Sequence, residues 1–235
     1  MLELSLSPTQ YSIVIPVYNE EESLKELLSE ILEVMRVCRS YEVIFVNDCS
    51  SDASLDIVED FKRGFPEIIR VLKLPERSGQ TLALHRGLEM AQGEIVVTLD
   101  ADLQNDPADI PRLFEKMKEG YDCVCGWRKA RQDTSLKAGL SKLGNVLQRL
   151  LTGLKVHDVS CTLRAYRSQC LSKITLKWEG QHRFIPLMLS LQGCRVDEII
   201  SNHRKRKYGD TKYSHKRIFR VVLDFFRIIM SRGKG

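Results

Sequence analysis

The most informative segment of this chain is Glu94-Ile-Val-Val-Thr-Leu-Asp-Ala-Asp-Leu-Gln104. Five mostly apolar residues, 95–99, lead into two carboxylates, Asp100 and Asp102, and then into the amide of Gln104. Two unpaired charges cannot both point into a core, so we expect a buried strand at Glu94–Leu99 with the carboxylates at its end. Oxygen ligands of this kind suit Mg²⁺ or Mn²⁺. The stretch therefore predicts a divalent-metal site made by Asp100, Asp102 and Gln104.

Similar strands precede this one. Apolar runs predict parallel strands at Ser12–Val17, Glu42–Asn47 and Ile69–Leu72, and a weaker strand at Asp122–Gly126. Helical spacing separates them: Leu24 to Met35 share one face, Leu55 to Phe61 indicate a helix capped by Ser51 or Asp52, and Asp106-Pro107 opens a third. This alternation predicts an α/β fold, a mainly parallel sheet with helices on both faces.

Polar motifs follow three of these strands, at Pro16–Glu20, Asn47-Asp48 and Asp100–Gln104. Because ligands of such sheets bind beyond the carboxyl ends of the strands, the first half of the chain is typical of a nucleotide site. A haloacid dehalogenase-type phosphatase carries its DxD near the N-terminus, with Thr or Val where this chain has Gln104. A Rossmann dehydrogenase needs GxGxxG after the first strand, where this chain has Pro16-Val-Tyr-Asn-Glu20. Neither class fits.

Composition and charge bound the class of protein. The chain has 235 residues, 43% hydrophobic and 29% charged, which is ordinary for a globular protein. Its seven scattered cysteines never form a CxxC pair, which indicates reduced thiols in a cytosolic compartment. No apolar run reaches the roughly 18 residues of a membrane span, and the N-terminus lacks a signal peptide. We expect a cytoplasmic protein.

The net charge of +5 hides an asymmetry: residues 1–125 carry −12, residues 126–200 carry +8 and residues 201–235 carry +9. This pattern indicates different partners for the two halves, or simply two solvated faces of opposite sign. Nucleic acid is not an expected partner, because Arg204-Lys-Arg-Lys207 lacks the interleaved aromatic residues of a stacking platform.

Three stretches resemble the family 2 glycosyltransferases, which have the GT-A fold: Ser12-Ile-Val-Ile-Pro-Val-Tyr-Asn-Glu-Glu21, Val46-Asn-Asp-Cys-Ser-Ser-Asp52 and Leu99-Asp-Ala-Asp-Leu-Gln104. Four more resemble the polyprenyl-phosphate sugar transferases, namely the dolichol-phosphate mannose synthase group and its bacterial undecaprenyl-phosphate relatives: Gly79-Gln-Thr-Leu-Ala83, Asp102-Leu-Gln-Asn-Asp-Pro107, His182-Arg-Phe-Ile-Pro186 and Arg206-Lys-Tyr-Gly-Asp-Thr-Lys-Tyr213. Together these motifs cover residues 10 to 215.

The resemblance implies a metal-dependent, inverting transfer of a sugar from a UDP- or GDP-linked donor to a polyprenyl phosphate. It implies that the nucleotide is bound by Pro16, Tyr18, Asn19, Glu20, Asp48 and Asp100, and the metal by Asp100, Asp102 and Gln104. On physical grounds alone, Asp48 is equally a helix cap or turn residue, and His182 is most simply a packed or hydrogen-bonded histidine.

The acceptor side follows from charge together with the resemblance. Guanidinium groups bind phosphate in a bidentate way, and the implied acceptor-phosphate residues are Arg128, Arg164, Arg206 and Lys212. Trp127 replaces the small residue common before that first arginine, and Cys161-Thr162-Leu163 replaces Ser-Gly-Phe. Because a phosphate acceptor is already ionised at neutral pH, the expected catalytic groups are Asp102, Arg128 and Arg206, with no strong general base.

Three segments are expected: a nucleotide-sugar and metal half at 1–126, an acceptor half at 127–213 and a basic amphipathic helix at 214–235. On that helix Ile218, Val222, Phe225 and Ile229 share one face, and Arg217, Arg220, Asp224 and Arg227 the other. The helix would lie on an anionic membrane at its cytoplasmic face, contact an integral partner or a second copy, or dock on its own domain. The chain is then a peripheral protein or a truncated one.

Two other functions remain open. One is a non-catalytic GT-A-like module at a membrane, which the intact Asp100, Asp102 and Gln104 argue against. The other is a transferase with a polysaccharide or other soluble acceptor; the QxxRW motif of processive synthases is absent, since Leu176-Lys177 precede Trp178.

Overall fold

A computed structural model describes residues 9–38, 40–129, 154–208, 223–225, 227–228 and 230. Lys212 and most of the predicted C-terminal helix lie outside these residues.

The described residues form one seven-stranded sheet in the order β3-β2-β1-β4-β6-β5-β7. The strands are β1 (Tyr11–Val17), β2 (Tyr41–Asn47), β3 (Ile69–Lys73), β4 (Ile95–Thr98), β5 (Cys123–Trp127), β6 (Arg164–Arg167) and β7 (Val196–Ile200). All pairs are parallel except those of β6, which runs antiparallel to β4 and β5 between them. The strand order reverses between β1 and β4, so the carboxyl ends of these neighbours form the switch point where ligands bind in such sheets.

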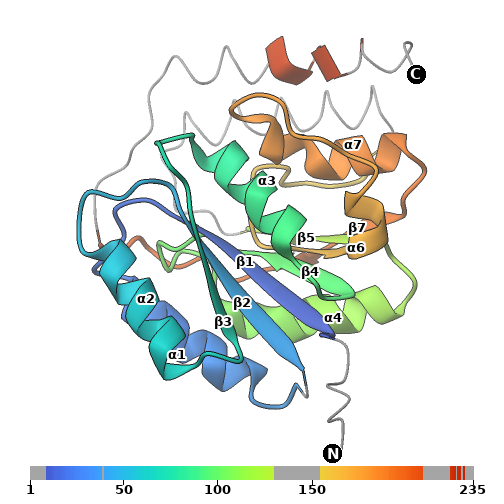
Figure 1. Ribbon diagram of the computed structural model, residues 1–235. Coiled ribbons are helices and arrows are strands. Elements are labelled where there is room, and N and C mark those ends of the chain that lie inside the picture. The colour runs from blue at the N-terminus through green and yellow to red at the C-terminus, as the bar shows by residue number, and fades with distance from the viewer. Residues whose placement is uncertain are drawn as a thin grey trace, which may run out of the picture.

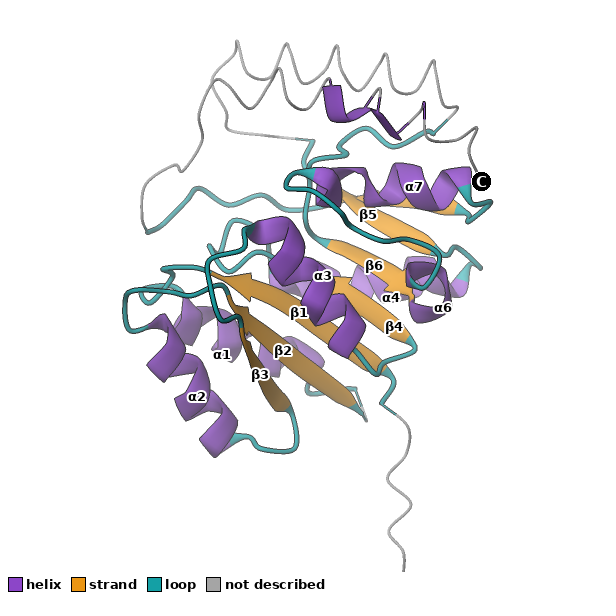
Figure 2. Cartoon of the chain, turned by 45° about the horizontal axis from the view of Figure 1, so that its top comes forward, coloured by secondary structure: helices purple, strands orange, loops and turns teal. Residues whose placement is uncertain are grey.

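Helices cover both faces of the sheet (Figures 1 and 2). On one face lie α1 (Leu24–Met35), α2 (Ser54–Gly64) and α4 (Ile110–Lys118), which the short 3₁₀ turn η1 (Pro107–Asp109) precedes. On the other lie α3 (Gln80–Met90), α6 (Ser168–Leu171) and α7 (Ile185–Leu191), with the turn η2 (Gln181–Phe184) before α7. The α1 face buries Leu24, Leu27, Leu28, Ile31 and Met35, the spacing seen in the sequence.

The predicted mainly parallel α/β sheet is confirmed, and each of the five predicted strands is found within one residue at each end. Asp106 caps η1 by accepting the Ala108 N–H, with Pro107 in the first turn, as predicted. At α2 the cap differs in detail: Ala53 is the residue before the helix, and the Asp52 carboxylate accepts the Ser54 N–H at 3.0 Å. No strand was predicted at β6 or β7, and no helix was placed at α3.

The described residues near the C-terminus pack on the domain. Phe225 and Ile228 are buried, and the Phe225 ring lies 6.4 Å from that of Phe184. Asp224, expected on the polar face, is also buried, and the Arg227 guanidinium lies over the Trp178 ring. These contacts favour a docked segment over a free amphipathic helix. Among the described residues, no helix has the length and apolar character needed to cross a membrane.

Candidate functional site

Strained backbone gathers where β1, β2 and β4 end. Among the described residues, the non-glycine residues with positive φ are Asn19, Cys49 and Leu103, and each lies in the loop that follows one of these strands. Such conformations cost free energy and concentrate at functional sites. The same three loops carry the predicted nucleotide and metal residues.

Asp100 lies directly beyond β4 with both carboxylate oxygens engaged. Oδ1 accepts a hydrogen bond from Gln80 Nε2 at 2.8 Å, and Oδ2 accepts one from Thr162 Oγ1 at 2.6 Å. Burial, and then the charge of Asp102, raise the pKa of Asp100 to about 6, although the Thr162 hydrogen bond works in the opposite direction. The raised pKa means that additional positive charge beside Asp100 would stabilise its ionised form.

Asp102 and Gln104 share one cationic partner. Arg206 Nη2 donates to Asp102 Oδ2 at 2.6 Å and to Gln104 Oε1 at 3.2 Å. The turn between them is shaped by Leu103 at φ 60° and by the Gln104 N–H, which donates to Asp102 Oδ1. Three oxygen-bearing side chains on one short loop, with one carboxyl of raised pKa, fit a divalent cation. The structure thus brings the predicted metal ligands together with a predicted acceptor arginine.

Arg206 belongs to a basic strap, residues 202–208, which runs along the acidic first half of the chain. Arg204 Nη1 contacts both carboxylate oxygens of Glu30 at 2.8 Å, and its Nη2 contacts Asp106 Oδ1 at 2.7 Å. Lys207 binds Glu26 at 2.7 Å, and Asn105 forms an isolated antiparallel bridge with His203. Although burial opposes the effect, the pKa of Asp106 is lowered by hydrogen bonds from Asn202, the Ala108 N–H and Arg204. Ion pairs thus fasten the strap over the loop after β4.

The predicted nucleotide residues lie at the ends of β1 and β2. The Arg77 guanidinium lies over the Tyr18 ring, 4.0 Å from the ring centroid. Asn19 Oδ1 accepts the Ser51 N–H at 2.8 Å, and the Glu20 N–H donates to Ser54 Oγ at 2.8 Å. These hydrogen bonds join the loop after β1 to the loop after β2. The Tyr18–Arg77 pair lies beside the switch point, because Tyr18 directly follows β1.

Asp48 acts in the structure as a turn residue, the alternative that physical grounds supported. Its carboxylate accepts the N–H groups of Ser78 at 2.6 Å and Gly79 at 2.9 Å, directly before α3. Gly79 has φ 89°, and a Cβ there would lie 2.7 Å from a carboxylate oxygen of Glu179. The Asp48 side chain therefore fixes the loop that carries Arg77.

The two arginines of the second half have different surroundings. Arg128, after β5, forms a two-point pair with Asp158: Nε to Oδ2 at 2.7 Å and Nη2 to Oδ1 at 3.0 Å. Arg164 is 2% exposed and donates to the backbone carbonyls of His182, Val159 and Arg183. These contacts give Arg164 a structural role, which differs from the predicted acceptor-phosphate role.

His182 is a packed histidine, as expected: it is 2% exposed, and its Nδ1 lies 2.6 Å from Thr81 Oγ1. It lines a small pocket at the switch point together with Pro16, Gln80, Leu84, Thr98, Leu99, Asp100, Thr162 and Arg164. The pocket confirms that residues far apart in the sequence meet beside Asp100.

Sequence reasoning missed Gln80, Thr162, Asp158 and Arg204 as residues of the site. Gln80 and Thr162 were noticed only as parts of motifs, and Arg204 only as one of four successive cations. Their roles come from partners 20 to 174 positions away, which no local spacing indicates.

A second cluster lies at the opposite edge of the sheet. Within the described part of the chain, the group of three His, Cys, Asp or Glu side chains close enough to share an ion is Asp122, Cys170 and Cys194. Asp122 and Cys194 precede β5 and β7, and Asp122 Oδ2 already accepts the Arg195 N–H at 2.8 Å. This cluster is remote from the loop after β4 and is not the predicted metal site.

Proteins of known name have similar sequences. Undecaprenyl-phosphate 4-deoxy-4-formamido-L-arabinose transferase of Salmonella choleraesuis is 37% identical over 215 residues, which cover 91% of this chain and 65% of that protein. Dodecaprenyl-phosphate galacturonate synthase of Rhizobium johnstonii is 34% identical over 225 residues, which cover 94% and 66%. The chain thus spans just under two thirds of the length of these relatives.

Two solved structures share the fold. Glucosyl-3-phosphoglycerate synthase of Mycobacterium tuberculosis, in complex with Mn²⁺, UDP and phosphoglyceric acid, matches with a TM-score of 0.67 at 18% identity, covering 95% of this chain and 78% of that one. TarS of S. aureus, in complex with UDP-GlcNAc, matches with a TM-score of 0.69 at 19% identity, covering 94% and 67%. The expected GT-A-like architecture is confirmed at the level of the fold.

The sequence model described as "Glycosyl transferase family 2" matches residues 12–175, from the first residues of β1 to beyond α6. This match covers more than half of the chain, and it includes the loops after β1, β2 and β4 that form the candidate site. The chain belongs to glycosyl transferase family 2.

Proposed function

We propose that this protein transfers a sugar from a nucleoside diphosphate carrier to a polyprenyl phosphate, with a divalent metal at Asp100, Asp102 and Gln104. One observation carries the proposal: carboxylates suited to a metal and arginines suited to a phosphate meet at the carboxyl edge of one sheet. Arg206 touches Asp102 directly, and the Arg128 charge lowers the pKa of Asp100, although burial and Asp102 raise it more.

On the donor side, Pro16, Tyr18, Asn19 and Glu20 form the proposed nucleotide pocket, and Asp48 helps to hold the nucleotide by fixing the loop that carries Arg77. The Tyr18 ring offers a stacking face, and Arg77 above it offers a cation for a diphosphate. When bound, the metal supplies positive charge to the departing diphosphate. The neighbours solved with UDP support a uridine nucleotide, and the one solved with Mn²⁺ supports the metal.

On the acceptor side, Arg128 and Arg206 hold the attacking phosphate oxygen in line with the anomeric carbon. The acceptor phosphate is already ionised, so attack needs no proton transfer to the protein. His182 is buried against Thr81 and is not required as a base. We leave Arg164 out of this set, because its guanidinium holds backbone carbonyls, and we keep Lys212 as a proposal from sequence.

The acceptor class rests on the relatives, whose names specify undecaprenyl phosphate and dodecaprenyl phosphate. A lipid acceptor implies that the protein works at a membrane surface, which we propose to be the cytoplasmic face. Residues 1–126 would bind the donor and metal, residues 127–213 the acceptor, and residues 214–235 the anionic surface, an integral partner or a second copy.

The test is transfer of radiolabelled sugar from UDP- and GDP-sugars to undecaprenyl phosphate in detergent, with Mn²⁺, Mg²⁺ or EDTA. We expect lipid-linked product with one nucleotide class, no product with EDTA, and none from Asp100→Asn or Asp102→Asn. Transfer that persists in EDTA contradicts the metal. Product on phosphoglyceric acid or on a polysaccharide, but not on the lipid, contradicts the acceptor.

A further inference from the structure

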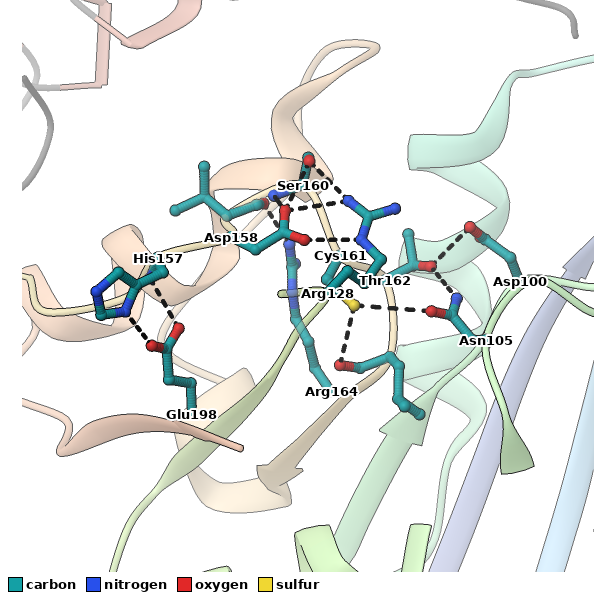
Figure 3. A network of polar contacts seen from close by, with 12 residues as sticks. Asp100, Asn105, Arg128, His157, Asp158, Ser160, Cys161, Thr162, Arg164 and Glu198 are labelled. Atoms are coloured by element: carbon teal, nitrogen blue, oxygen red, sulfur yellow. Dashed lines mark hydrogen bonds and ion pairs between the residues drawn. The ribbon is translucent and has the colours of Figure 1, made fainter. Parts of the chain in front are cut away.

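One loop contacts both the proposed metal ligand Asp100 and the proposed acceptor-phosphate ligand Arg128 (Figure 3). It comprises residues 157–162 and leads towards β6. At its end, Thr162 Oγ1 donates to Asp100 Oδ2 at 2.6 Å and accepts from Asn105 Nδ2 at 3.0 Å. The Thr162 carbonyl accepts from Thr98 Oγ1 at 2.6 Å. The hydroxyl is thus held by its own backbone in the position that orients Asp100.

The start of the same loop holds the acceptor arginine. Asp158 is 4% exposed as a side chain and Arg128 is 13% exposed, so their two-point pair is shielded from water. Ser160 Oγ donates to Asp158 Oδ1 at 2.9 Å and accepts from Arg128 Nη2, also at 2.9 Å. The guanidinium plane is therefore fixed by two side chains of this loop.

Separate contacts anchor the loop to the sheet. Glu198 of β7 accepts the His157 N–H at 2.7 Å and bonds the His157 imidazole as well. That ring stacks on Trp127 with centroids 4.2 Å apart and planes 14° apart. From within the domain, Arg164 Nη2 holds the Val159 carbonyl at 2.6 Å. Trp127 adjoins Arg128 in sequence, so the stack ties the loop to the strand end that bears the arginine.

We propose that the loop 157–162 positions both sides of the reaction, with Thr162 orienting Asp100 toward the metal and Asp158 orienting Arg128 toward the acceptor phosphate. The inference rests on the proposed function and adds Thr162, Asp158, His157 and Glu198 as positioning residues. Groups that hydrogen-bond a metal ligand fix its orientation, and losing them typically weakens metal binding about 10–100-fold.

The first test measures Mn²⁺ binding alone, from the EPR signal of free Mn²⁺ in a titration without substrates. Thr162→Val keeps the shape of the side chain but removes its donor, and we expect about tenfold weaker binding. Thr162→Ser restores the donor and should restore the affinity. Thr175→Val makes the same exchange at an exposed residue and should bind as the wild type.

The second test separates the acceptor side. Asp158→Asn should raise the KM for undecaprenyl phosphate at least tenfold while the KM for the nucleotide-sugar stays within twofold, and Asp158→Glu should recover part of the loss. At saturating Mn²⁺, Thr162→Val should leave the acceptor KM within twofold. Melting curves with and without Mn²⁺ identify any variant that fails to fold, in which case Thr162→Ser and Asp158→Glu carry the comparison.

Two failures are distinguishable. If wild-type protein binds Mn²⁺ and Asp100→Asn abolishes that binding, yet Thr162→Val binds as tightly as wild type, the positioning inference is overturned alone. Equal losses in every parameter for both variants also overturn it, because they indicate a purely structural loop. If the wild type does not bind Mn²⁺, or if Asp100→Asn binds it as tightly as the wild type, the proposed function itself is overturned.

Discussion

Removing the Arg206 guanidinium should strengthen metal binding while it weakens transfer. Arg206 Nη2 lies 2.6 Å from Asp102 Oδ2, with 21% and 12% of the two side chains exposed, so the pair is largely shielded. A hydrogen bond to a charged group contributes about 1.5–3 kcal/mol. A cation that binds Asp102 must replace or share this contact. Since about 1.4 kcal/mol is a factor of ten, Arg206→Gln should bind Mn²⁺ at least tenfold more tightly.

The assay is again a Mn²⁺ titration by EPR, followed by transfer kinetics on the same samples. Lys205→Gln removes an adjacent, exposed cation and reports how much of the gain comes from charge at a distance. Arg206→Gln should exceed that control in Mn²⁺ affinity and yet have a raised acceptor KM. Unchanged or weaker Mn²⁺ binding in Arg206→Gln would refute the idea that the arginine and the metal compete for Asp102.

Three further predictions concern the strap, the core and the membrane. Arg204→Ala removes the ion pairs of Arg204, a side chain that is 33% exposed, with Glu30 and Asp106. The free energy of unfolding should fall by about 2 kcal/mol, and Tm should fall by about 4–8 °C. Lys207→Ala should change Tm little, because that side chain is more exposed. Gly87→Ala places a Cβ 2.9 Å from Val46 Cγ2 and closer still to Val14, so urea unfolding should show a loss of about 1–3 kcal/mol, while Gly64→Ala, with nothing within 4 Å, should be neutral or stabilising. Binding to anionic vesicles in a sedimentation assay should weaken as NaCl rises; salt-independent binding would contradict an electrostatic contact.

The part of the fold that the sequence predicted depends on local pattern. Buried parallel strands form unbroken apolar runs, so β1, β2 and β4 could be located within a residue from the printed letters. The loops that follow them carry the polar residues, and sheet geometry alone places those loops together. The grouping of the candidate metal and nucleotide residues at one edge of the sheet could therefore be predicted without any structure.

The rest depends on contacts between distant residues. β6 is the four-residue strand Arg164–Arg167, with an arginine at each end, so it lacks the apolar run that marks a strand. Arg164 is buried and donates to the backbone carbonyls of Val159 and of two residues of η2. Arg164, which the resemblance suggests as a phosphate ligand, thus has its guanidinium engaged by the backbone. Thr162 gains its role only because β6 inserts between β4 and β5 and brings its loop beside Asp100. No periodicity in the sequence encodes that insertion.

The charge asymmetry of the sequence corresponds to ion pairs within the protein, which neither interpretation of the sequence included. The acidic half and the basic segment were expected to face different partners or to be two solvated faces. In the structure they bind each other: Arg204, Arg206 and Lys207 of the strap pair with Glu30, Asp102 and Glu26. Salt therefore acts on two equilibria, since it weakens attraction to an anionic surface and also loosens the strap.

Because Arg206 is both the end of an intramolecular ion pair and a proposed phosphate ligand, the acceptor phosphate must compete with Asp102 for it. A divalent cation that takes over Asp102 would release Arg206 to the acceptor, so metal binding should lower the acceptor KM, and this coupling should vanish in Arg206→Gln.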